Sequence, residues 1–153
     1  MSTPRATALR LAAAATALLL SGCVTPAPTT AAYESKAAMT ADAAVSEVRT
    51  AVLATNAYLR DGTTGAYLET VLVDAEEAFG SVQATFDSVQ PPATPAADAL
   101  RATLDPLLQD AGSGLTDLRI AARRQQRNPL GATAHDLSGV ADKLEAFGKE
   151  HGP

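Results

Sequence analysis

The 153-residue sequence contains one cysteine, two histidines and no tryptophan. A single cysteine excludes an internal disulfide framework, and the absence of a Cys-x-x-Cys-His motif excludes covalent haem attachment. Di-iron helical bundles need inward carboxylates with Glu-x-x-His pairs, and neither His135 nor His151 follows a carboxylate at that spacing. We therefore expect no metal and no cofactor, and we expect both histidines to lie at the surface.

Candidate catalytic residues are equally scarce. Ser113 lies in the segment AGSG, but no strand of the kind required by a nucleophile elbow precedes it. No phosphate-binding loop motif is present. We therefore expect the protein not to be an enzyme.

The first 20 residues have the pattern of a signal peptide. Arg5 and Arg10 supply positive charge, and residues 11–20 are uncharged, with Thr16 as their one polar residue. A transmembrane helix needs roughly 20 apolar residues, so this run is too short for a permanent span.

The lone cysteine follows directly. Leu20, Ser21, Gly22 and Cys23 resemble the lipobox of bacterial lipoproteins, in which a branched apolar residue and two small residues precede an obligatory cysteine. The resemblance covers residues 1–23. It implies cleavage after Gly22, a diacylglycerol thioether on Cys23, and attachment to the extracytoplasmic side of the cell membrane, since two or more acyl chains bind a bilayer durably. The alternative is a spare cysteine behind an ordinary secretory leader, but an unpaired thiol is unusual in an exported protein.

Beyond the cysteine, the chain divides into a tether and one domain. Residues 23–30 are rich in proline and threonine and are expected to form a short flexible tether, and residues 31–153 are expected to form the domain. Loss of Arg5 and Arg10 with the signal peptide changes the formal net charge from −5 to −7. Such an acidic chain has no reason to bind nucleic acid.

The domain has the periodicity of helices. β-Branched and aromatic residues never alternate over a sustained stretch, whereas apolar residues recur at spacings of three and four. The expected core positions of four segments are Ala38, Ala41, Val45, Val48, Val52, Thr55 and Leu59; Leu68, Leu72, Ala75, Phe79, Val82, Phe86 and Val89; Ala97, Leu100, Leu104, Leu107, Leu108, Ala111, Leu115 and Leu118; and Leu130, Thr133, Leu137, Val140, Leu144 and Phe147.

Turn and capping residues separate these segments. We expect Asp61 or Gly62 to end the first helix in a left-handed conformation, and Thr63 or Thr64 to cap the second. Thr94–Pro95 and Asn128–Pro129 are expected to begin the third and fourth. Short connections make neighbouring helices antiparallel, so the sequence predicts an all-α, up-down-up-down four-helix bundle.

Arginines are concentrated near the end of the third helix, at positions 119, 123, 124 and 127. One interpretation is that they complement the helix dipole and pair with Asp117 or Asp136. The other is that Arg119, Arg123, Arg124 and Arg127 form a binding patch for anionic headgroups, cell-wall phosphate or an acidic partner. The acidic residues Asp74, Glu76 and Glu77 are expected to form a solvated face.

The third helix also contains Pro106, Gly112 and Gly114, and we expect it to kink or break. The glycines serve either close packing or a hinge that opens an apolar pocket. Tyr58 and Tyr67 flank the first turn and are expected to meet at one end of the bundle.

These observations favour a lipid-anchored bundle at the cell envelope that acts as a non-catalytic binding or accessory module. Its expected partners are the membrane, through the anchor, and an envelope protein, lipid headgroup or cell-wall component. The alternative is a carrier that holds a small apolar ligand between helices near Pro106.

Overall fold

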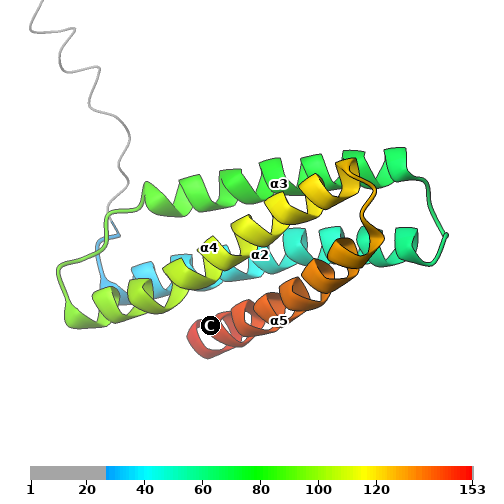
Figure 1. Ribbon diagram of the computed structural model, residues 1–153. Helices are drawn as coiled ribbons and strands as arrows, with labels where there is room; N and C mark the ends of the chain where they lie inside the picture. The colour runs from blue at the N-terminus through cyan, green and yellow to red at the C-terminus, as the bar shows by residue number, and fades with distance from the viewer. Residues whose placement is uncertain (1–26, 153) are drawn as a thin grey trace, which may run out of the picture.

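The protein is an all-α four-helix bundle. A computed structural model describes residues 27–152, which form α2 (Thr30–Leu59), α3 (Gly65–Asp87), α4 (Pro95–Arg123) and α5 (Arg127–His151). The start of α2, the end of α3, the start of α4 and the end of α5 lie together, so neighbouring helices alternate in direction (Figure 1). The predicted architecture is confirmed. The lipobox residues Leu20, Ser21, Gly22 and Cys23 lie outside the described residues.

Three of the four predicted helix boundaries have the expected chemistry. The side chains of Thr64 and Thr94 accept hydrogen bonds from the backbone N–H groups of Tyr67 and Ala97. Asp61, with a φ of 57°, is the left-handed residue after α2. The prediction at Asn128–Pro129 is wrong, because α5 already begins at Arg127 and its N-cap, Gln126, makes no side-chain capping bond.

The last residues assigned to the tether belong to the bundle. Thr29 caps α2 by accepting a hydrogen bond from the N–H of Ala32, and Thr30 is the first helical residue. Ala27 is buried, and its N–H donates to the backbone oxygen of Gln90 over 3.3 Å. This contact fixes where the chain enters the bundle, and we call this end the entry end.

The core follows the predicted stripes closely in α3 and α4. Leu68, Leu72, Phe79, Leu104 and Leu115 are all buried. Alanine broadens the buried face of α2, where the sequence pattern missed six buried residues: Tyr33, Ala37, Ala44, Ala51, Ala54 and, in the connection before the helix, Ala27.

The stripe of α5 is shifted by one residue at two positions. Ala134 and Ala141 are buried, whereas Thr133 and Val140 are half-buried. The predicted core positions Thr133 and Val140 are therefore wrong, because helices pack closely where small residues line the contact.

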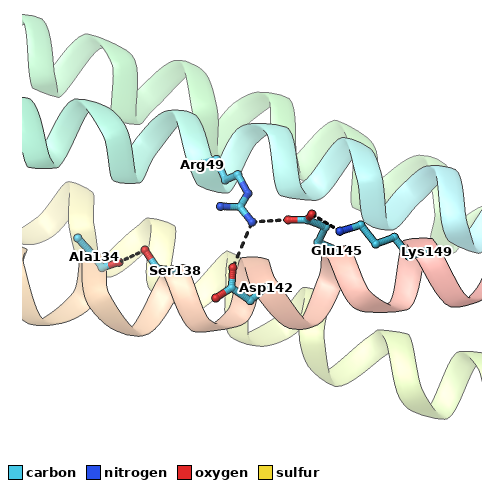
Figure 2. Close-up of polar contacts among 6 residues, drawn as sticks. All are labelled: Arg49, Ala134, Ser138, Asp142, Glu145 and Lys149. Carbon is cyan, nitrogen blue, oxygen red and sulfur yellow. Dashed lines mark hydrogen bonds and ion pairs between the residues drawn. The ribbon is translucent and has the colours of Figure 1, made fainter.

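Small residues bring α2 and α5 close together. A Cβ added to Gly148 of α5 would come within 3.3 Å of the Cγ of Asp42 on α2. Arg49 of α2 reaches across the same interface to Asp142 and Glu145, and Lys149 contacts Glu145 over 2.6 Å (Figure 2). Hydrogen bonds from Lys149 and Arg49 lower the pKa of the Glu145 carboxyl.

Two helices that are diagonally opposite in the bundle, α2 and α4, are in contact with each other. α2 lies against each of the other three helices, whereas α3 and α5 make no such contact with each other. The alanine-rich face of α2 and the small residues of α4 permit this cross-bundle contact.

Helix α4 continues through Pro106 without interruption, so the expected break does not occur there. The glycines that follow serve close packing. A Cβ on Gly112 would lie 3.2 Å from Cε1 of Phe79, and one on Gly114 would lie 2.6 Å from Cδ2 of Leu137. Both positions therefore let a large side chain of a neighbouring helix approach the backbone of α4.

Candidate functional site

The four predicted patch arginines lie at the end of the bundle opposite the entry end, but they have different surroundings. Arg119 is partly buried and forms an ion pair with Glu76 of α3. Thr116 donates a hydrogen bond of 2.8 Å to the same carboxylate. Glu76 is therefore not part of a purely solvated acidic face, and Arg119 joins α3 to α4.

The Glu76–Arg119 pair makes stability depend on pH. Burial raises the pKa of Glu76, but hydrogen bonds from Arg119 and Thr116, together with the arginine charge, outweigh it and lower the pKa. A carboxyl with a lowered folded-state pKa contributes stability above its unfolded pKa, and this is lost as pH falls through the folded pKa. Glu76→Gln should therefore cost about 1 kcal/mol at pH 7, and the cost should shrink at pH 3.

Urea unfolding of the wild type and Glu76→Gln at both pH values measures this difference. Glu77→Gln is the matched control, because Glu77 is the exposed neighbour on the same helix. An equal cost at pH 7 and pH 3 would contradict the assigned role of the ion pair.

Arg127 joins the start of α5 to the turn between α2 and α3. Its guanidinium forms an ion pair of 3.2 Å with Asp61 and donates a hydrogen bond of 2.6 Å to the backbone oxygen of Leu59. The same group lies 5.2 Å from the ring centroid of Tyr58. Tyr58 is thus covered by Arg127, and the ring contacts of the described residues do not include the expected Tyr58–Tyr67 pair. Tyr67 is 57% exposed.

Arg123 and Arg124 remain available at the surface. Both are exposed, and neither forms an ion pair with any residue in the range 27–152. The predicted pairing with Asp117 or Asp136 is wrong. Arg119 pairs with Glu76 instead, and Arg127 pairs with Asp61.

Arg60 belongs to the same end. It follows directly on α2, is exposed, and likewise has no ion-pair partner in the described part of the chain. Sequence reasoning missed it because the end of α2 meets the end of α4 only once the bundle has formed. We call this end of the bundle, which carries Arg60, Arg123 and Arg124, the arginine end.

Charge is divided unevenly along the bundle. When each helix is divided at its midpoint, the half with the arginine end has six basic and eight acidic residues, and the entry half has four basic and nine acidic residues. Most of the net negative charge therefore lies in the entry half. An acidic partner would meet the least repulsion at the arginine end.

The depression beside Gly112 has the wrong chemistry for an apolar carrier. It has a volume of about 440 Å³, is open to solvent, and is lined largely by polar residues, with Leu108 as its one large apolar residue: Gln83, Leu108, Gln109, Gly112, Ser113, Thr116 and Asp117. An apolar ligand would find little surface there to bury.

An apolar groove lies elsewhere, between α2 and α3, towards the entry end. It has a volume of about 380 Å³, and its apolar lining comes from Met39, Ala43, Val82, Phe86 and Val89. Sequence reasoning placed Val82 in the core, but this side chain is half-buried and lines the groove. The signal that could have revealed the groove is Met39, which lies off the predicted core stripe of α2 and is 68% exposed.

The two histidines have different environments. His135 is exposed, as predicted. His151 is the last residue of α5, and its Nδ1 lies 2.9 Å from Oε1 of Glu34. The centroids of the His151 and Phe147 rings are 4.5 Å apart. His151 is therefore half-buried in the packed entry end and not fully at the surface as expected. Within residues 27–152, no three His, Cys, Asp or Glu side chains are grouped so that they could hold a metal ion.

Comparisons with protein-family models, curated proteins and solved structures found no match. Among the described helices, none has both the length and the apolar character needed to cross a membrane.

Proposed function

We propose that this protein is a lipid-anchored lipoprotein of the bacterial cell envelope whose helical bundle is a non-catalytic binding module on the extracytoplasmic side. The lipobox resemblance at Leu20–Cys23 supports the anchor. The observation that supports the binding role is the position of the arginine end, which carries exposed cations without partners within residues 27–152 and lies opposite the point where the chain enters.

The length of the helices decides which partner is favoured. Helix α4 has 29 residues, which corresponds to about 43 Å at 1.5 Å per residue. If Cys23 holds the entry end at the membrane, an upright bundle places the arginine end several Debye lengths, at about 8 Å each, from the headgroups of that membrane. The favoured partner is therefore an acidic component beyond the membrane, such as a cell-wall phosphate polymer or an acidic envelope protein.

Replacing the exposed arginines should weaken binding to cell-wall material that carries phosphate polymers. We expect Arg123→Gln combined with Arg124→Gln, in soluble Cys23→Ser protein produced without residues 1–22, to bind about fivefold more weakly at low salt, because each exposed charge contributes up to about 1 kcal/mol. Wild-type binding should fall as salt rises, and the variant should show a flatter dependence. Co-sedimentation with isolated cell walls, over a range of salt concentrations, measures both effects.

The control is Lys143→Gln combined with Lys149→Gln, which removes the same charge from exposed positions in the entry half. Lys149, unlike Arg123 and Arg124, pairs with Glu145, so urea unfolding of this variant is measured alongside its binding. Its binding should stay close to that of the wild type. Equal losses in the two double variants would show that only net charge matters, and stronger, salt-sensitive binding to anionic vesicles than to cell walls would favour lipid headgroups as the partner.

A further inference from the structure

The apolar groove between α2 and α3 lies near Ala27, where the described chain enters the bundle. We propose that, when the protein is outside a bilayer, this groove holds one acyl chain of the lipid on Cys23. This inference rests on the proposed function, because it requires Cys23 to be lipidated.

The connection from the anchor to the groove is short. Ala27 is buried and bonded to Gln90, and Val89, the residue before Gln90, lines the groove. Ala27 is the fourth residue after Cys23, so the extended chain between their Cα atoms spans at most about 14 Å. Acyl chains attached at Cys23 would therefore start close to the mouth of the groove.

The lining suits an unbranched hydrocarbon chain. Apolar side chains supply most of the exposed lining, and the volume of about 380 Å³ falls within the usual range for small-molecule sites. The polar lining residues are Thr40, Ser81 and Thr85, and Lys36 is the one charged residue among them. Its ammonium group can donate a hydrogen bond to an ester carbonyl of the lipid.

The bilayer and the groove compete for the chain. A bilayer surrounds every methylene group, whereas the open groove covers a chain on one side only, so an anchored protein should keep its acyl chains in the membrane. In water, the short tether holds the chain near the groove at a high effective concentration, and burial there shields it from solvent.

A tryptophan reporter can test occupancy, because the chain contains no tryptophan. Met39→Trp places a reporter at the groove, and Leu53→Trp is the matched control, since Met39 and Leu53 are 68% and 67% exposed on the same helix and Leu53 does not line the groove. In the soluble Cys23→Ser protein, spin-labelled palmitate should quench the fluorescence of Met39→Trp saturably and that of Leu53→Trp only weakly. Equal quenching of the two variants, or none of either, would overturn the proposal.

The lipidated protein then identifies the occupant. With Cys23 intact and lipidation verified by intact mass, the attached chain should compete with added spin-labelled palmitate. The concentration needed to quench the Met39→Trp reporter should then rise by about tenfold or more. Val82→Glu should remove quenching of the Met39→Trp reporter in the soluble protein. Thr85→Glu provides the same test at an exposed lining position, where loss of folding is not expected.

The outcomes separate this inference from the proposal on which it rests. A chain without lipid mass on Cys23 would refute the lipoprotein proposal, and this inference with it. A lipidated chain whose groove binds added palmitate as readily as the Cys23→Ser protein does would refute only the inference.

Discussion

Phe79→Ala should lower the free energy of unfolding by about 3–5 kcal/mol. Phe79 is 2% exposed and packs against the backbone of α4 at Gly112, where even a Cβ would come 3.2 Å from its ring. Truncation removes the buried ring and leaves a cavity. Because helix backbone forms one wall of that cavity, the surrounding structure can collapse only partly, and the cost should fall in the upper part of the range.

Urea denaturation with a two-state fit measures this change. Glu77→Ala, two residues earlier and exposed, should change the free energy of unfolding by no more than about 0.5 kcal/mol. Similar denaturation midpoints for the two variants would contradict the register of α3 in the bundle.

Cys23→Ser should move the protein from the membrane fraction to the soluble fraction, or leave it as an uncleaved precursor. The lipid is the only stable membrane attachment that the proposal gives the mature chain, and serine has no thiol to accept the diacylglycerol group. Two or more acyl chains bind a bilayer durably, so their loss should be nearly all-or-none in a fractionation experiment. Metabolic labelling with a fatty acid, followed by fractionation, measures both attachment and partition.

Ser21→Ala is the matched control, because it keeps a small residue in the lipobox and leaves the cysteine in place. It should be labelled and should partition with membranes like the wild type. Normal processing and membrane partition of Cys23→Ser would show that the lipoprotein proposal is wrong.

The sequence predicted the bundle because its strongest signals are local. Spacings of three and four identify helices, and Thr64, Thr94 and Asp61 act within their own turns. The start of α5 was misplaced because Gln125, with a φ of 53°, turns the chain without a glycine or a capping side chain.

The finer packing could not be read from the sequence, because it depends on neighbouring helices. Ala134 and Ala141 are buried in preference to Thr133 and Val140, since the close approach of α5 to its neighbours selects small residues there. No rule based on a single helix distinguishes a small residue that permits contact from one that merely occupies the surface.

The candidate site was predicted only in part. The cluster of Arg119, Arg123, Arg124 and Arg127 is visible in the sequence. Which of these arginines form ion pairs cannot be read from it, because Glu76 lies 43 residues from Arg119 and Asp61 lies 66 residues from Arg127. The position of Arg60 at the arginine end, and the apolar groove, both depend on how the helices pack against each other. No sequence motif links the residues of either feature.

The meeting of the first and last helices at the entry end has a topological consequence. Glu34 and His151 are in contact, so the backbone at Ala27 and at Gly152 reaches the same end of the molecule. A circular permutant that joined these points through a short linker, and opened the chain in the turn after Asp61, would keep all four helices in their present places. The order of the helices along the chain and their arrangement in space are, in this bundle, separable properties.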